Sequence, residues 1–389
     1  MEQKIKTVFI SRTSFLGGAE RTLLNLIIKI NKNTFEPIVI LPDKNGQLYD
    51  ELKNNNINIL IVKMPFLRLT YNLFLYIWFF LKLLIINISL YSLFKREEVN
   101  LIINNSFQDS LYSIFAAKFL KIKLIIYIKN IFNRKWKKYI RSKVLEFFAT
   151  KVIAVSEKAK EDISLFARKK DFVEVIYEGL DLIKHKKNNS KDFLNNTFQD
   201  DLNNYFRILN IGNLSLLKGQ LLLVQAMLTE KLKDKKIKVI FLGDAVYKRD
   251  LAYKKNLNNF IRLNNSTNKF FFYGFQPNPE KYMINADLII HCPIMDDCSP
   301  MVILEALLYG KIVLATKVGG IPEIIREGFN GFLCEPNKED LANKILFIYN
   351  NIKNLDFLSN NAKKTVTEKF NLDIQIKKTE EVYKNIINK

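Results

Sequence analysis

Residues 287–310 read DLIIHCPIMDDCSPMVILEALLYG and place a short apolar strand, a turn and an apolar helix in direct succession. The helix is expected over 301–308, because Ser299 is a good N-cap, Pro300 suits the first helical position and Gly310 is a typical helix stop. A helix that begins directly after a strand presents free backbone N–H groups and a partial positive charge. This stretch therefore predicts a site for a phosphate or another anion.

Two carboxylates flank the start of the predicted helix. Asp297 lies in the turn and Glu305 lies eight residues later, inside the helix. Both could face one cleft and accept hydrogen bonds from the hydroxyl groups of a ligand. Two solvated acids are the more common explanation for such a pair, so the spacing alone does not identify a site.

On both sides of this stretch the chain alternates apolar strands, glycine loops and amphipathic helices. A strand over 6–10 is followed by the loop Gly17-Gly18, a helix over 19–30 and a strand over 35–41. This order is a crossover between parallel strands. The same patterning predicts strands over 101–103, 124–128, 152–155, 206–211, 236–242, 269–273, 287–291 and 311–315, and a helix over 372–387.

Length and element spacing predict two domains. A chain of 389 residues is too long for one ordinary core. The polar stretch 184–204 is the expected linker between a domain over 1–183 and a second domain over 205–370. A final helix over 371–389 is expected to pack back on the first domain. The predicted fold class is α/β, with two Rossmann-like domains whose parallel sheets face a cleft between them.

The net charge of +21 favours an anionic partner. Phosphorylated substrates and an anionic membrane face are candidates, and nucleic acid ranks last because no nucleic-acid-binding motif is visible. The alternative is a chain rich in Lys, Asn and Ile whose charges are merely solvated. Three cysteines and two histidines, without ligand spacing, predict neither a disulfide framework nor a metal site. The first residues lack the apolar core of a signal peptide, so we expect a cytoplasmic protein.

Residues 67–94 are almost entirely apolar and aromatic, with only Arg68 and Lys82 charged. Three interpretations stay open: a half-buried helix of the first domain, a helix on a membrane surface, and a membrane span. The span is disfavoured, because Lys82 lies in the middle and strand-like segments flank the stretch. A basic patch at 134–138, together with Arg141, supports the surface helix, since its Trp136 among cations suits an anionic lipid interface.

The segment 297–306 (DCSPMVILEA) resembles the acidic–seven residues–acidic signature of family 4 retaining glycosyltransferases, with Asp297 where Glu is usual. The segments 318–325 (VGGIPEII) and 328–333 (GFNGFL) resemble the next motifs of that family. The match is most specific over residues 206–350 and covers nearly the whole chain. It implies the GT-B fold, the fold class of the group 1 glycosyl transferases. It also implies a nucleotide-sugar donor substrate, no further cofactor, and transfer with retained anomeric configuration.

Short glycine loops resemble the ligand-binding turns of this family and follow its order. With the start of the 301–308 helix, they are expected to surround the phosphates and the nucleobase of the donor. Lys218 matches the family's phosphate-binding lysine, whereas Asn213 stands where an arginine is usual. The resemblance predicts these donor-binding residues: Gly17, Gly18, Gly212, Asn213, Gly243, Gly274, Phe275, Ser299, Pro300, Met301 and Val302.

The resemblance also implies three catalytic residues. Lys218 would contact the donor diphosphate, Asp297 would hold sugar hydroxyls and Glu305 would hold the ribose. No Asp-x-Asp sequence occurs, so we predict no bridging metal. Lys218 and the helix start would offset the charge of the leaving group instead. A donor phosphate oxygen would help to deprotonate the acceptor.

Three departures from the family fall in the first domain. Relatives often carry a histidine near Asn105 and another near Lys129 and Asn130, and neither is present here. Glu178 stands where Asn is more usual. Asn105, Lys129 and Asn130 are therefore only candidate contacts for the sugar or the acceptor.

The sequence thus predicts a metal-independent hexosyltransferase that acts on a saccharide acceptor. The apolar stretch and the basic surface favour a lipid-linked acceptor in surface polysaccharide or glycolipid assembly, at the inner face of the cell membrane. Two alternatives stay open. One is a sugar-nucleotide epimerase of the same architecture, and the other is a sugar-nucleotide-binding protein whose catalytic site has decayed.

Overall fold

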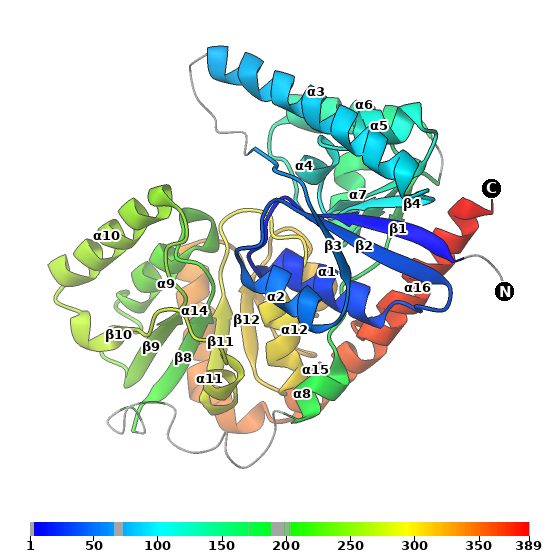
Figure 1. Ribbon diagram of the computed structural model, residues 1–389. Coiled ribbons are helices and arrows are strands. Elements are labelled where there is room, and N and C mark those ends of the chain that lie inside the picture. Colours follow the sequence, from blue (N-terminus) through cyan, green and yellow to red (C-terminus); the bar gives the residue numbers. More distant parts are fainter. Residues whose placement is uncertain are drawn as a thin grey trace. The chain divides into compact units, whose positions relative to one another are not determined.

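The structure is a computed structural model that describes residues 4–65, 73–169, 171–187, 198, 202 and 204–388. It consists of two compact units, one formed by residues 1–178 with 372–389 and the other by residues 179–371. Most of the linker predicted over 184–204 lies outside the described residues, and helix α8 (Leu182–Lys187) leads into it. Each unit contains one parallel sheet with its helices, so the α/β class and the two Rossmann-like domains are confirmed (Figure 1).

The first unit has a seven-stranded sheet in the order β3-β2-β1-β4-β5-β6-β7, with every pairing parallel. Its central strands are buried on both faces, which explains their unbroken apolar runs. The strand order reverses between β1 and β4, so the loops after these two strands mark the switch point of this sheet, the place where such sheets commonly bind ligands. The strands are β1 (Ile5–Ile10), β2 (Phe35–Leu41), β3 (Asn58–Ile61), β4 (Leu101–Asn104), β5 (Lys123–Ile128), β6 (Lys151–Ala154) and β7 (Val173–Val175).

The second unit has a six-stranded parallel sheet in the order β10-β9-β8-β11-β12-β13. Its order reverses between β8 and β11, so the loops after these two strands mark its switch point. The strands are β8 (Phe206–Ile211), β9 (Ile237–Leu242), β10 (Phe270–Phe272), β11 (Leu288–His291), β12 (Val313–Thr316) and β13 (Phe332–Cys334).

The predicted strands occur within two residues of their expected bounds, and the sequence pattern does not predict β3, β7 and β13. All three are edge strands of three or four residues with a single neighbour. Such strands need no continuous apolar run, because a sheet edge is less deeply buried than its centre. Segments of this length give too few residues for a periodicity to emerge.

The helices of the first unit include α16, which follows the second unit in sequence. It packs against α1, and its Tyr383 hydroxyl lies 3.0 Å from that of Tyr127 on β5. Tyr383 also meets the ring of Phe35 edge-on, and all three side chains are buried. The helices are α1 (Gly18–Lys29), α2 (Gln47–Asn54), α3 (Leu73–Arg96), α4 (Phe107–Ser110), α5 (Ile114–Phe119), α6 (Lys135–Phe148), α7 (Glu157–Ser164) and α16 (Leu372–Ile387).

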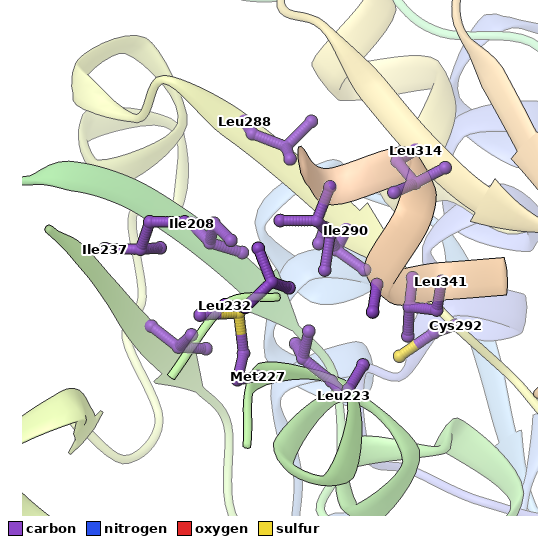
Figure 2. Packing of buried hydrophobic residues seen from close by; sticks show 14 of the residues in the cluster. Ile208, Leu223, Met227, Leu232, Ile237, Leu288, Ile290, Cys292, Leu314 and Leu341 are labelled. Carbon is purple, nitrogen blue, oxygen red and sulfur yellow. The ribbon is translucent and has the colours of Figure 1, made fainter. Parts of the chain in front are cut away.

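The core of the second unit holds β8 and β11 in place. Figure 2 shows Ile208 and Ile290 from these strands facing Leu223 and Met227 of α9 and Leu341 of α14. Each fully buried side chain of this size contributes about 1.5–3 kcal/mol. After α8, the helices are α9 (Gln220–Met227), α10 (Lys248–Leu263), α11 (Glu280–Asn285), α12 (Met301–Leu308), α13 (Ile321–Ile324), α14 (Lys338–Asn351) and α15 (Phe357–Lys369).

Candidate functional site

Three polar side chains meet at the switch point of the second unit. His291 is the last residue of β11, Asp297 lies in the loop that follows, and Lys218 lies in the loop after β8. The Nζ atom of Lys218 is 2.7 Å from Oδ2 of Asp297, and Nε2 of His291 is 3.1 Å from the same oxygen. Two partners on one oxygen orient the carboxylate and leave Oδ1 as the oxygen that can accept bonds from a ligand.

Electrostatics keep this carboxylate ionised. Burial alone would raise the pKa of Asp297, but the Lys218 ammonium and the hydrogen bond from His291 outweigh it and hold that pKa well below its ordinary value. Burial lowers the pKa of His291, and its bond to Asp297 opposes this only in part. A neutral His291 must carry its proton on Nε2 to donate to the carboxylate. The sequence predicts Asp297 and Lys218 here, but not their contact or the part of His291.

Backbone contacts from a glycine pair fix the loop that carries Asp297. Gly320 N–H donates to the Asp297 carbonyl over 2.8 Å, and Gly319 N–H donates to the Asp296 carboxylate over 3.0 Å. Gly319 has φ +57°, and a Cβ there would lie 2.3 Å from the Asp297 carbonyl oxygen. The 318–325 motif therefore supports the loop that carries Asp296 and Asp297. The sequence of the motif does not reveal this structural role.

A similar close approach fixes Lys218. Gly219, at φ +68°, would place a Cβ 1.9 Å from the carbonyl oxygen of Cys292. The loop before it is also joined to the β11 loop, because Ile294 N–H donates to the Leu217 carbonyl over 3.1 Å. Backbone contacts thus hold the two loops of the switch point together.

Helix α12 begins at Met301 as predicted, but its N-cap differs from expectation. The helix begins at Met301 with Pro300 as its N-cap, and no side chain caps it, so the prediction of Ser299 as N-cap is wrong. Pro300 suits this end because its missing N–H leaves one fewer unsatisfied donor there. Glu305 lies in the second turn and is half-buried, as are Ser299, Met301 and Val302.

Three of the glycine turns predicted to bind the donor, those of Gly212, Gly243 and Gly274, lie at the carboxyl ends of strands of the second sheet. Gly243, after β9, donates its N–H to the Gly274 carbonyl over 2.7 Å. A side chain on Gly243 would meet the Gly212 carbonyl oxygen at 2.2 Å, so the loops after β8, β9 and β10 are in contact. Asn213 and Phe275 are exposed on these loops and can reach a ligand.

In the first unit, a buried ion pair lies beside α1. Lys129, which follows β5, has its Nζ 3.0 Å from Oε1 of Glu178 and donates to the Thr22 hydroxyl over 2.7 Å. It also lies 3.2 Å from the Ala19 carbonyl, which accepts from Asn105 Nδ2 over 3.3 Å. The two departures from the family pattern, Lys129 and Glu178, are therefore partners of each other.

The other predicted positions of the first unit have structural contacts. Gly17 is the N-cap of α1, which begins at Gly18. Asn130 accepts hydrogen bonds from Arg141, which is buried and paired with Asp162. Arg141 therefore does not belong to a basic surface patch, contrary to the sequence interpretation.

One buried acid of the first unit escapes sequence analysis. Asp109 accepts from the Ser106 hydroxyl over 2.7 Å and from the Arg12 backbone N–H over 3.1 Å. Burial raises the pKa of Asp109 to about 6 despite these contacts. No spacing in the sequence distinguishes it from a solvated acid. Across the described ranges, no group of three or more His, Cys, Asp or Glu is placed to hold a metal ion.

The two units match two family models. Residues 16–184 match Glycosyltransferase Family 4, and residues 194–365 match Glycosyl transferases group 1. An uncharacterized glycosyltransferase of Methanocaldococcus jannaschii is 30% identical over 261 residues, which are 62% of this chain and 62% of that protein. The chain thus spans less than two thirds of the length of that relative.

Two further comparisons cover more of the chain. The UDP-Gal:alpha-D-GlcNAc-diphosphoundecaprenol alpha-1,3-galactosyltransferase of Escherichia coli is 24% identical over 77% of this chain and 79% of its own. The crystal structure of Anabaena HepE in complex with UDP-glucose superposes with a TM-score of 0.83, at 22% identity, over 98% of this chain and 99% of that chain. This likeness establishes the GT-B fold.

Proposed function

Because the chain belongs to the glycosyltransferases, with a Family 4 half and a group 1 half, we propose that it transfers a hexose from a nucleotide sugar to a hydroxyl group of a saccharide. One observation supports this proposal most directly. Lys218 and His291 converge on one oxygen of Asp297, at the switch point where a parallel α/β sheet binds ligands. An oriented anion beside a cation suits a donor that has both sugar hydroxyls and a diphosphate.

The proposed donor is a UDP-sugar. The E. coli relative is named for UDP-Gal, and HepE was crystallised with UDP-glucose, which favours this nucleotide. Asp297 would accept bonds from the sugar hydroxyls, and Glu305 from the ribose. Lys218 and the first N–H groups of α12 would contact the diphosphate. These groups offset the leaving-group charge without a bound metal.

The proposed reaction retains the anomeric configuration. The bond between the sugar C1 and the diphosphate oxygen breaks, and the acceptor oxygen bonds to C1 from the same face. The acceptor proton passes to an oxygen of the departing diphosphate, so the products are a glycoside and UDP. The role of the protein is to hold the oxocarbenium-like state and the diphosphate in position.

The proposed acceptor is a lipid-linked saccharide at the inner face of the cell membrane, in surface polysaccharide or glycolipid assembly. Two relatives are named for acceptors of this kind: the diphosphoundecaprenol of the E. coli enzyme, and the lipopolysaccharide of a Salmonella typhimurium N-acetylglucosaminetransferase. An acceptor held in a bilayer requires an enzyme that reaches the bilayer surface.

The first test is a thermal-shift panel of nucleotide sugars, with and without EDTA. A ligand at 100 times its Kd adds about 2.7 kcal/mol to the free energy of unfolding. We expect one UDP-sugar to raise the Tm, and we expect the rise to survive EDTA. No rise with any donor would contradict an intact donor site, and a rise abolished by EDTA would contradict metal independence.

Turnover then separates the transferase from the alternatives. We incubate the bound donor with and without a diphospho-lipid-linked saccharide and follow UDP release and the sugar anomer by NMR. A transferase releases UDP only with acceptor and forms an α-linked product from an α-linked donor. UDP release and epimer formation without acceptor would indicate an epimerase, and binding without turnover would indicate a decayed site.

A further inference from the structure

Helix α3 lies on the surface of the first unit with an apolar side turned outward. One stripe of the helix is buried, with Phe79, Leu83, Ile86, Leu90 and Phe94 below 9% exposure. The opposite side exposes more than half of each of these side chains: Trp78, Phe80, Leu81, Leu84, Ile85 and Ile88. A helix that is apolar on all sides is normally buried on all sides. An exposed apolar side of this length therefore indicates that a surface outside this unit packs against it.

Asn87 fixes which side of α3 faces the protein. Its buried amide donates to the Leu111 carbonyl over 3.2 Å and accepts from the backbone N–H groups of Phe115 and Ala116 over 3.1 and 3.3 Å. These bonds would be lost if α3 left the unit. Among the described residues, the segment Ile77–Arg96 is long and apolar enough to cross a membrane. The buried stripe and Asn87 instead hold α3 alongside the unit.

Two neighbouring helices, α5 and α6, also expose apolar side chains. Helix α5 packs on α3, and its Phe115 meets Phe148 of α6 edge-on, with ring centroids 5.3 Å apart. The three helices lie together in Figure 1. On α5 and α6, these large apolar side chains are exposed: Phe115, Phe119, Trp136, Tyr139, Ile140 and Phe147. We call the exposed apolar residues of α3, α5 and α6 the docking surface.

Basic residues accompany the docking surface. Helices α3 and α5 contain no Asp or Glu, and α6 contains only Glu146, which lies 3.0 Å from Lys143. The ammonium of Lys82 lies 3.6 Å from the centre of the Trp78 ring, so even this mid-helix cation lies over an aromatic side chain. The other cations at these helices are Lys95, Lys118, Arg134, Lys135 and Lys137, whereas Arg96 pairs with Glu97 and Lys138 pairs with the buried Asp162.

We propose that the docking surface binds the face of an anionic lipid bilayer, with α3 lying in the plane of the interface. Aromatic rings and Lys or Arg side chains together suit the headgroup level, where apolar area and cations act jointly. A second copy of this chain fits less well, because a symmetric contact would bring like charges together. The proposal depends on the first unit alone and is independent of the proposed reaction.

Both tryptophans of the chain, Trp78 and Trp136, lie on the docking surface and supply an intrinsic reporter. We titrate the full chain, without donor or acceptor, with vesicles of phosphatidylcholine alone or mixed with phosphatidylglycerol. We expect flotation and a blue shift of tryptophan fluorescence with the anionic vesicles only, weakened by salt. Lipids brominated at shallow positions should quench this fluorescence more than lipids brominated near the bilayer centre.

Two variants separate the apolar and basic parts. Leu84→Glu with Ile88→Glu should lower vesicle partitioning at least about tenfold, since two apolar contacts are replaced by charges. Lys135→Ala with Lys118→Ala should lower it about fivefold per lysine removed, and only with anionic vesicles. Leu263→Glu, at an exposed apolar site of the second unit, is the matched control and should bind as wild type.

Far-UV CD and a thermal melt of each variant show whether it is folded. Wild type that stays soluble with anionic vesicles at low salt would overturn the proposal. So would equal binding to neutral vesicles. A wild-type dimer that becomes a monomer with Leu84→Glu and Ile88→Glu, without vesicle binding, would assign the docking surface to a second copy instead. None of these outcomes bears on donor binding, which is measured separately.

Discussion

Lys218 Nζ lies 2.7 Å from Oδ2 of Asp297, although the two residues are 79 positions apart in the chain. The ion pair joins the loops after β8 and β11, the two strands at the switch point of the second sheet. In the proposed donor complex, Lys218 contacts both this carboxylate and the diphosphate, which would link sugar recognition to phosphate binding. A substitution at either residue should therefore alter how the other residue contacts the donor.

Asp297→Asn should weaken binding of the UDP-sugar about 10- to 100-fold, because a charged hydrogen bond contributes about 1.5–3 kcal/mol. Binding of UDP alone should change much less, since Lys218 is then released to the diphosphate. Isothermal titration with both ligands measures the split. Asp234→Asn, at an exposed acid of the second unit away from the site, is the control. Equal losses for UDP and UDP-sugar would contradict the assigned contact.

His291→Leu should lower kcat/KM for the donor about tenfold, because Asp297 loses one of the two bonds that orient it. His291→Gln keeps an N–H donor and should recover part of the loss. Steady-state kinetics of both variants make the comparison. If Gln and Leu were equally impaired, His291 would serve packing and not orientation.

Gly319→Ala should abolish donor binding. The new Cβ would lie 2.3 Å from the Asp297 carbonyl oxygen, so the acidic loop must move. Gly328→Ala is the matched control, since Gly328 has a similar φ of +67° but no atom within 4 Å of such a Cβ. Both variants carry the strain of a left-handed residue, about 1 kcal/mol. Donor titration of the two separates loop displacement from that strain, and loss of binding in both would contradict the assignment.

Lys129→Met should destabilise the first unit by about 3 kcal/mol, because Glu178 is left buried without its cation. Adding Glu178→Gln should restore most of the loss, which makes the pair strongly non-additive in a double-mutant cycle. Urea unfolding followed by tryptophan fluorescence reports the first unit, which holds both tryptophans. Additive losses would show that the two residues act independently.

Asp109 predicts a pH effect on stability. Its pKa is raised to about 6, so the folded chain keeps this proton as the pH rises above 4, whereas the unfolded chain loses it near 3.9. Protonation therefore favours the fold at low pH, and this contribution is lost between about pH 4 and pH 6. The free energy of unfolding of wild type, minus that of Asp109→Asn, should fall by about 2 kcal/mol from pH 4 to pH 7.

The same tryptophan-monitored urea unfolding, repeated at several pH values, measures this difference. Asp50→Asn, at an exposed acid of α2, serves as the control for general charge effects. A constant difference between wild type and Asp109→Asn would show that the carboxylate ionises normally in the folded chain.

The sequence predicts the central strands and the helix over 301–308 closely, because full burial on both sides imposes an unbroken apolar run. It also predicts Asp297 and Lys218. It does not predict their contact, the bond from His291, or the Gly319 support. These contacts join residues far apart in the chain through loop geometry, which has no periodicity. For Arg141 the prediction from the sequence is wrong. This arginine stands in a basic run, which suggests an exposed position, but its side chain is buried against Asp162.

The position of α16 has a consequence for synthesis on the ribosome. Tyr383 fills space beside Phe35 and Tyr127 in the first unit, yet it is translated after the whole second unit. A nascent chain therefore carries an unfinished N-terminal core while the second sheet, whose residues are contiguous, can already close. Domains often fold in the order of translation. Here the first unit is begun first but completed last. Part of its aromatic core stays exposed until α16 has been translated.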